Sequence, residues 1–242
     1  DISEKLISCK YQSPKEIPRA RNNELAILSL NIRSIHKNLL QIQDDIHEYD
    51  KYDVISLCES NCNISKLPNG EDDILIEGFN PPIHQAPARA SCRGGGLLIY
   101  VHKRVCNSED IEIVDIDHEP STYAEFLAVK IRSCKNTNNT VVIVNMYRSP
   151  SSSNTSNFIK ALDESLTKLR KHSKKHILLT GDSNIDLLKH EYDENSQNLI
   201  DTTATHGFAQ LSRPTRITDH SCTLIDQISV SYTHLTLPTI YS

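Results

Sequence analysis

Apolar residues along the chain follow two patterns, short continuous runs and helical spacing. The segment Leu25-Ala-Ile-Leu-Ser-Leu-Asn31 is an apolar run that ends in a polar residue, which is typical of a buried strand. Between residues 38 and 49 the apolar side chains are three or four positions apart, and this spacing predicts a helix. The run Asp53-Val-Ile-Ser-Leu-Cys58 predicts a second buried strand, which ends at Glu59. The chain therefore opens with strand, helix and strand.

The remainder of the chain is richer in strands. β-branched or alternating segments, separated by Pro, Gly, Asn and Asp, predict strands at residues 74–76, 96–101, 111–114, 123–131 and 140–146. A helix is predicted over about residues 155–171, a buried strand at 176–180 and a short helix near 198–205. Two further strands are predicted at 208–211 and 224–230. This order of elements indicates a layered α/β sandwich.

Composition limits the class of protein. Of the 242 residues, 38% are hydrophobic and 24% are charged, which is ordinary for a globular chain. No apolar run reaches about eighteen residues, so we expect neither a membrane span nor a membrane partner. The seven cysteines are scattered without the second pair that a zinc site needs, and we interpret them as reduced intracellular thiols. A net charge of −5 leaves any affinity for nucleic acid to a local basic surface.

Polar side chains recur where predicted buried strands end. Asn31 and Glu59 follow the first two strands, and Asp182 and Asn184 follow the strand at 176–180. Each residue alone has an ordinary explanation as a turn or cap residue. Their repetition at strand ends indicates one rim of an α/β sheet, which is where ligands bind in such folds.

The residue types at this rim suit phosphate chemistry. The carboxylates of Glu59 and Asp182 fit a hard cation such as Mg²⁺, which prefers oxygen ligands. The amides of Asn31 and Asn184 can hold phosphate oxygens or a water without adding negative charge, and Tyr147 adds a hydroxyl donor. A Lewis acid, a carboxylate that activates water and donors for the developing charge are the requirements of metal-assisted phosphodiester hydrolysis.

Five motifs carry a resemblance to a known family. They are Gly94-Gly-Gly-Leu-Leu-Ile-Tyr100, Tyr147-Arg-Ser-Pro150, Gly181-Asp-Ser-Asn-Ile-Asp186, Arg213-Pro-Thr-Arg216 and Thr223-Leu-Ile-Asp226. In order and spacing they resemble the endonuclease/exonuclease/phosphatase superfamily, and most closely the apurinic-like endonuclease domain of non-LTR retrotransposons. The resemblance covers about residues 24–230. It implies a DNase I-like fold, a four-layered α/β sandwich of two mostly antiparallel β-sheets flanked by helices.

The resemblance also implies a role for each matching residue near the metal and the water. Glu59 would bind the divalent metal, Mg²⁺ or alternatively Mn²⁺, and Asn31 would support the metal–phosphate end of the site, as a second metal ligand as well as a catalytic residue. Asp182 would orient and activate the attacking water. Asn184 would help to position that water and the phosphate.

The other matching residues would act on the substrate, except Asp226. Tyr147 would donate to the phosphate or assist the leaving oxygen, and Asp226 would belong to the metal or histidine-orienting group. Thr215 would line the site, while Arg148 and Arg216 would contact DNA phosphates, with a solvated surface charge as the alternative for each.

Two further features have a structural explanation beside a functional one. The glycines at positions 94–96 lack the Gly-Lys-Ser/Thr of a nucleotide loop, and we interpret them as a tight turn before a strand. A basic cluster surrounds the end of the second helix and comprises Lys168, Arg170, Lys171, Lys174 and Lys175. It could contact DNA, but cations at a helix C-terminus are also favoured by the helix dipole.

The two ends of the chain depart from the family. Residues 1–23 are polar and are expected to form a flexible lead-in. Related domains continue to a terminal Ser-Asp-His, whereas His234 here follows Tyr-Thr, and the segment from about Val230 resembles a translated sequencing adapter. We therefore expect an endonuclease domain at 24–229 that lacks its last strand, and a non-native tail at 230–242. Such a fragment would be catalytically impaired.

The combined hypothesis is a Mg²⁺-dependent domain that nicks target DNA for retrotransposition. It would be monomeric, act in the nucleus, and precede a reverse transcriptase domain in the polyprotein. One alternative is another phosphoesterase of the same superfamily that acts in DNA repair, RNA trimming or inositol phosphate hydrolysis. The other alternative is a degenerate copy without catalytic activity.

Overall fold

The structure is a computed structural model that describes residues 20–21, 24–88, 94–116, 120–132, 140–150, 154–172, 176–211, 216–218 and 221–231. The strands are β1 (Ile27–Asn31), β2 (Val54–Cys58), β3 (Ile83–Gln85), β4 (Leu97–Val101), β5 (Ile111–Ile113), β6 (Glu125–Ile131), β7 (Val141–Tyr147), β8 (His176–Asp182), β9 (Phe208–Gln210), β10 (Arg216–Thr218), β11 (Ser221–Thr223) and β12 (Asp226–Ser231). The helices are α2 (Ile35–Tyr49), α3 (Thr155–His172) and α4 (Glu194–Thr205), with short 3-10 turns η2 (Ile64–Lys66), η3 (Gly70–Ile74), η4 (Ser108–Asp110) and η6 (Leu187–Lys189).

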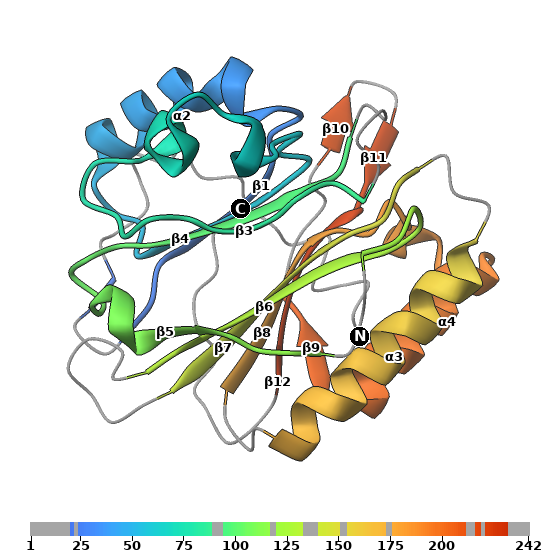
Figure 1. Ribbon diagram of the computed structural model, residues 1–242. Coiled ribbons are helices and arrows are strands. Elements are labelled where there is room, and N and C mark those ends of the chain that lie inside the picture. Colours follow the sequence, from blue (N-terminus) through green and yellow to red (C-terminus); the bar gives the residue numbers. More distant parts are fainter. Residues whose placement is uncertain are drawn as a thin grey trace.

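The strands form two large sheets and one small hairpin. The four-stranded sheet has the order β1-β2-β4-β3, and the six-stranded sheet has the order β5-β6-β7-β8-β12-β9. Only β1–β2 and β7–β8 pair in parallel, and the other pairs among the described strands are antiparallel. Figure 1 shows α2 on the outer side of the first sheet and α3 with α4 along the second. This arrangement confirms the expected DNase I-like sandwich of two mostly antiparallel sheets flanked by helices.

Alternate side chains of each central strand enter different apolar layers. In β4, Leu97 and Ile99 pack between the two sheets, whereas Leu98 and Tyr100 pack beneath α2. In β6, Phe126 faces the third layer, which is filled by apolar side chains of α3 such as Phe158 and Leu162. Strands that are covered on both faces expose neither face to solvent, and they therefore appear in the sequence as continuous apolar runs.

Buried polar side chains join the two sheets at the centre of the sandwich. The Nδ2 of Asn145 in β7 donates to the carbonyl of Leu57 in β2 over 2.8 Å. The hydroxyls of Ser56 in β2 and Thr180 in β8 lie 2.8 Å apart and share a hydrogen bond. Both bonds are fully buried, where such contacts are directional and are not exchanged for water. They therefore fix how far one sheet is displaced along the other.

Most of the expected helices and strands are present within a few residues of their predicted bounds. The strand expected at residues 74–76 is wrong, because Ile74 ends the turn η3 and the next residues form no strand. Ile74 and Ile76 are buried against side chains of α2 while Leu75 is exposed, so the segment shows a strand-like alternation without strand pairing. The short strands β3, β10 and β11 were not predicted from the pattern.

The first and last described residues can be compared with the expected domain bounds. Strand β12 continues to Ser231, past the expected boundary at residue 230, and the Ser231 Oγ accepts a hydrogen bond from the Ile177 N–H over 2.9 Å. Residues 1–19 and 232–242 lie outside the described residues, so the expected lead-in and the nature of the tail stay predictions. Within the described residues, no helix is both long and apolar enough to cross a membrane.

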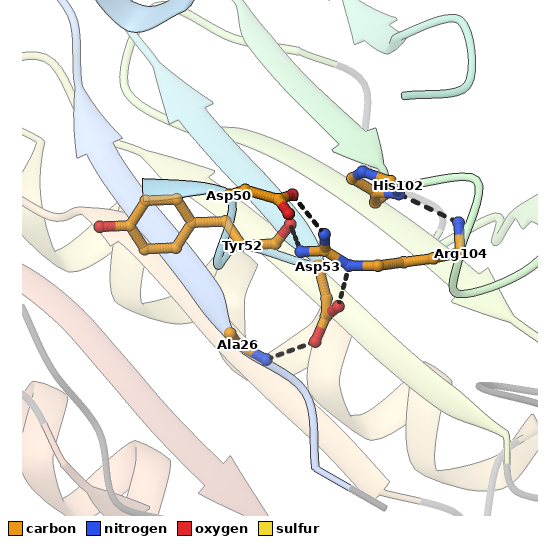
Figure 2. A network of polar contacts seen from close by, with 6 residues as sticks. All are labelled: Ala26, Asp50, Tyr52, Asp53, His102 and Arg104. Carbon is orange, nitrogen blue, oxygen red and sulfur yellow. Dashed lines mark hydrogen bonds and ion pairs between the residues drawn. The ribbon is translucent and has the colours of Figure 1, made fainter. Parts of the chain in front are cut away.

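A polar network closes the end of the first sheet where β2 begins. Arg104 donates through Nε to Asp53 over 2.9 Å, through Nη1 to Asp50 over 2.7 Å and through Nη2 to the Tyr52 carbonyl over 2.7 Å (Figure 2). Asp53 is buried and also accepts from the Ala26 N–H over 2.9 Å. This carboxylate thus links the start of β1 to the start of β2, at the opposite end of β2 from Glu59.

We expect His102, beside this network, to make the stability of the fold depend on pH. Its Nδ1 accepts a hydrogen bond from the Arg104 N–H, which requires an unprotonated nitrogen (Figure 2). Burial, and then repulsion from Arg104, lowers the pKa of His102. The unfolded chain therefore binds this proton more readily, so the free energy of unfolding should decrease as the pH falls below about 6.5.

Urea unfolding at several pH values tests this expectation. Between about pH 7 and pH 5, the free energy of unfolding of His102→Gln should decrease less than that of the wild type. His36→Gln, which changes an exposed histidine of α2 away from this network, controls for the loss of one imidazole. A His102→Gln slope equal to that of the wild type would contradict the interpretation.

Candidate active site

The chemically active residues meet at one edge of the two sheets. The parallel strands β1 and β2 both end at this edge, with Asn31 opposite Cys58 in the register and Glu59 directly after it. In the second sheet, Tyr147 pairs with Asp182 at the ends of β7 and β8. Because β12 runs antiparallel to β8, it begins at the same edge, and its first residue, Asp226, also pairs with Asp182. The topology brings five of the predicted residues to one edge of the molecule.

The amide of Asn31 connects the carboxylates of the two sheets. Its Nδ2 donates to Glu59 Oε1 over 2.7 Å and to Asp182 Oδ2 over 2.9 Å. The other end of the amide, Oδ1, accepts from the Arg33 N–H over 3.2 Å. A donor rather than an oxygen therefore faces the carboxylates, and this orientation favours Asn31 as a bridge between them over Asn31 as a metal ligand.

Asp182 is fully buried, and both of its carboxylate oxygens are engaged. Oδ2 accepts from Asn31, and Oδ1 accepts from the backbone N–H of Asn184 over 2.8 Å. The preceding Gly181 has a φ of +120°, and a Cβ there would lie 1.9 Å from the Met146 carbonyl. Only glycine allows β7 to approach β8 so closely at this point, which explains the Gly-Asp order of the motif.

Tyr147 is held as a neutral hydroxyl. Burial, and then the negative charge of Glu59 together with a hydrogen bond to it, raises the pKa of Tyr147, and Asp182 raises it further. A phenol with a raised pKa keeps its proton at neutral pH. Tyr147 can therefore donate a hydrogen bond to an anionic substrate but cannot serve as a base.

Three carboxylates produce a shared negative field at this edge. Burial raises the pKa of the Cys58 thiol, and the charges of Asp182, Asp226 and Glu59 raise it further, in that order. All three negative charges thus act on one buried sulfur. A divalent cation would offset their mutual repulsion.

The carboxylates at this edge form an open set of oxygen donors. Among the described residues, no group of three or more His, Cys, Asp or Glu side chains is arranged to enclose one. Mg²⁺ does not need such an enclosure, because it is usually bound through one or two carboxylates and keeps several of its waters. The partly exposed carboxylate of Glu59, beside Asp182 and Asp226, fits this mode of binding.

Arg148 lies in a different place from the one expected. It is 5% exposed, and its Nε and Nη2 each donate over 2.6 Å, to the carbonyls of Ser183 and Asn184 respectively. The Asn184 Nδ2 donates in turn to the Arg148 carbonyl over 2.7 Å. The guanidinium therefore holds the loop after β8, and its burial does not favour the expected contact with DNA phosphate.

The other residues predicted to contact the substrate or DNA are only partly within the described residues. Thr215 is outside the described residues, and Arg216 is described only as the first residue of β10, without its side chain. In the basic cluster, Lys168 pairs with Asp115 over 3.3 Å and Arg170 lies over the ring of Phe208. The other members of the cluster, Lys171, Lys174 and Lys175, have no described side chains.

Sequence reasoning missed Glu125, a fourth carboxylate at this edge. Glu125 is the first residue of β6, pairs with Tyr147 in the register and is 4% exposed. An acidic residue ahead of the apolar run Phe126–Val129 was the available signal. Without the structure it is indistinguishable from a residue that marks where a strand reaches the solvent.

Comparison with known proteins assigns the chain to a family. The model of the endonuclease/exonuclease/phosphatase family matches residues 28–240, and the chain belongs to this family. No curated protein sequence matches the chain significantly.

Solved structures share the fold at low sequence identity. An AP endonuclease, LMAP, from Leishmania major has a TM-score of 0.65 at 13% identity, over 95% of this chain and 90% of that one. The APE2 catalytic domain from Xenopus laevis has a TM-score of 0.62 at 16% identity, over 85% and 82%. The 3′ phosphatase NExo from Neisseria, bound to a product DNA hairpin, has a TM-score of 0.61 at 16% identity, over 86% and 87%.

We predict that Arg148 contributes to stability rather than to a surface contact. Arg148→Met removes the hydrogen bonds to the Ser183 and Asn184 carbonyls and should lower the free energy of unfolding by about 3 kcal/mol. Urea unfolding measures this, with Arg21→Met, at a side chain that is 84% exposed, as the control. A change as small as that of the control would instead support a solvated arginine that is available to phosphate.

Proposed function

We propose that this chain is a metal-dependent endonuclease that nicks DNA by hydrolysing a phosphodiester bond. The observation that carries the proposal is the convergence of Glu59, Asp182 and Asp226 on one edge, with Asn31 hydrogen-bonded to two of them. Membership of the endonuclease/exonuclease/phosphatase family supports hydrolysis of a phosphate ester. The fold shared with the AP endonuclease LMAP, and with the 3′ phosphatase NExo bound to a product DNA hairpin, supports DNA as the substrate class.

Glu59 would hold a Mg²⁺ or Mn²⁺ ion, with Asp226 contributing from the second sheet. When bound, the ion would polarise a phosphate oxygen and offset the negative charge of the site. The residues around it supply only oxygen and amide groups, which suits a hard cation. The neutral Tyr147 adds a hydrogen-bond donor without a second positive charge.

Asp182 would orient the attacking water and accept its proton. The hydrogen bonds from Asn31 and from the Asn184 N–H hold the carboxylate in one orientation, which is what a positioned base requires. Tyr147 would donate to the phosphate or to the leaving oxygen. Asn184, which is itself fixed by its bond to the Arg148 carbonyl, would border the phosphate.

The proposal extends to the genetic element that encodes the endonuclease. The motifs Tyr147-Arg-Ser-Pro150 and Arg213-Pro-Thr-Arg216 support the endonuclease of a non-LTR retrotransposon polyprotein. In that setting the partner is target DNA, the place of action is the nucleus, and a reverse transcriptase domain belongs to the same polyprotein. The domain would act as a monomer.

We expect the chain to convert supercoiled plasmid into open circles in the presence of Mg²⁺, and not when EDTA removes the metal. Asp182→Ala and Glu59→Ala should each lower the nicking rate on the order of 10²–10⁴-fold, because one removes the base and the other a metal ligand. Glu164→Ala, at an exposed carboxylate of α3, is the control and should nick at the wild-type rate.

The same preparations should be assayed with an inositol polyphosphate and with short RNA. Phosphate release or RNA cleavage without plasmid nicking would assign the site to another branch of the family. Residual nicking that is equal in the wild type and in both alanine variants would come from a contaminating nuclease and would contradict the proposal.

A further inference from the structure

Glu125 is a buried carboxylate that none of the roles above uses. It opens β6 next to Tyr147, and the charge of Glu59 acts on it across the site. Burying a carboxylate is unfavourable, and repulsion from the charge of Glu59 adds to that cost. An apolar residue would be expected here if stability alone decided the choice.

Both oxygens of Glu125 bind backbone N–H groups of the segment that enters β4. Oε1 accepts from Ala88 over 2.8 Å, and Oε2 accepts from Gly96 over 2.6 Å. Two acceptors directed at two donors require a carboxylate, because an amide offers only one oxygen. Through its bond to Gly96, Glu125 therefore fixes the end of the turn formed by Gly94, Gly95 and Gly96, and its bond to Ala88 holds the carboxylate in place.

The three glycines of this turn lie directly against side chains of the site. Their φ angles are +110°, +89° and +82° for Gly94, Gly95 and Gly96, in the region that disfavours other residues. A Cβ on Gly94 would lie 3.1 Å from the Tyr147 hydroxyl, and a Cβ on Gly95 would lie 2.7 Å from Glu125 Oε1. The turn thus fits its backbone against Tyr147 with no side chain between them.

The turn is also tied to the loop that carries Glu59. The N–H groups of Ser60 and Asn61 donate to the carbonyls of Gly96 and Gly95 over 3.0 and 2.9 Å. The Gly94 N–H donates back to Asn61 Oδ1 over 2.6 Å. A displacement of the turn would therefore move both the residues after Glu59 and the surface that contacts Tyr147.

We propose that Glu125 is a positioning residue of the phosphoesterase site: by binding the Gly96 N–H at the end of the Gly94–Gly96 turn, and the Ala88 N–H beside it, Glu125 sets the relative placement of Glu59 and Tyr147. The inference rests on the proposed function, since it assigns Glu125 to the same site. Glu125 acts through the turn, and its own oxygens are already occupied by the backbone.

The test compares Glu125→Gln with Asp53→Asn in the full chain. Each substitution removes one buried carboxylate that accepts hydrogen bonds through both oxygens, from Ala88 and Gly96 at Glu125 and from Ala26 and Arg104 at Asp53, but Asp53 lies at the far end of β2. Glu125→Gln should lower kcat for plasmid nicking 10- to 100-fold while KM changes less than about twofold, because the turn positions reacting groups. Asp53→Asn should lower the melting temperature and leave kcat unchanged.

Binding of Mn²⁺, followed by electron paramagnetic resonance of the free ion, provides a measurement that needs no substrate. Glu125→Gln should weaken Mn²⁺ binding about 10-fold through the displaced Glu59, whereas Asp53→Asn should bind as the wild type does. Wild-type kcat and wild-type Mn²⁺ affinity in Glu125→Gln would overturn the inference.

A second variant keeps the test decisive if Glu125→Gln does not fold. Gly95→Ala places a methyl group on Glu125 Oε1 and should give the same loss of kcat and of Mn²⁺ affinity while the carboxylate itself remains. A folded Gly95→Ala with wild-type kcat and affinity would overturn the inference. If the wild type binds Mn²⁺ but nicks no DNA, the proposed function fails while the Mn²⁺ titrations still decide the role of Glu125.

Discussion

The geometry of the site depends on the two buried hydrogen bonds that join the sheets. Asn145 lies two residues before Tyr147 and bonds to the carbonyl of Leu57, two residues before Glu59. Thr180 lies two residues before Asp182 and bonds to Ser56. Residues two apart on a strand share a face, so these contacts occur one step below the site on the same inter-sheet face. Sliding one sheet by a single residue, roughly 3.3 Å, would break both bonds and separate the carboxylates. Apolar packing alone would resist such a shift less, because it is not directional.

The sequence could predict the strands and their polar ends for a local reason. A strand buried on both faces is a short apolar run, and a residue such as Asn31 or Asp182 at its end interrupts that run visibly. Arg148 and Glu125 could not be assigned in this way. The carbonyls that bind Arg148 lie 35 and 36 positions further along the chain, and the N–H groups that bind Glu125 lie 37 and 29 positions before it. Whether a charged residue is solvated or buried depends on such distant partners, which periodicity does not reveal.

Strained backbone gathers in the loops of the site, although Asp50, which ends α2 at the other end of the first sheet, is also left-handed. Several described residues other than glycine adopt a left-handed backbone in the loops of the site: Arg33 at φ +54°, Glu59 at +53°, Asn61 at +50° and Asn184 at +50°. Each such residue costs on the order of 1 kcal/mol relative to an ordinary conformation. At Glu59 a glycine would adopt this backbone with less strain, so stability alone does not explain a glutamate there. Its carboxylate, held by Asn31 and facing Tyr147, does explain it. The fold tolerates strain and crowded negative charge at this edge because the strands beneath it are packed on both faces and joined by Asn145 and Thr180.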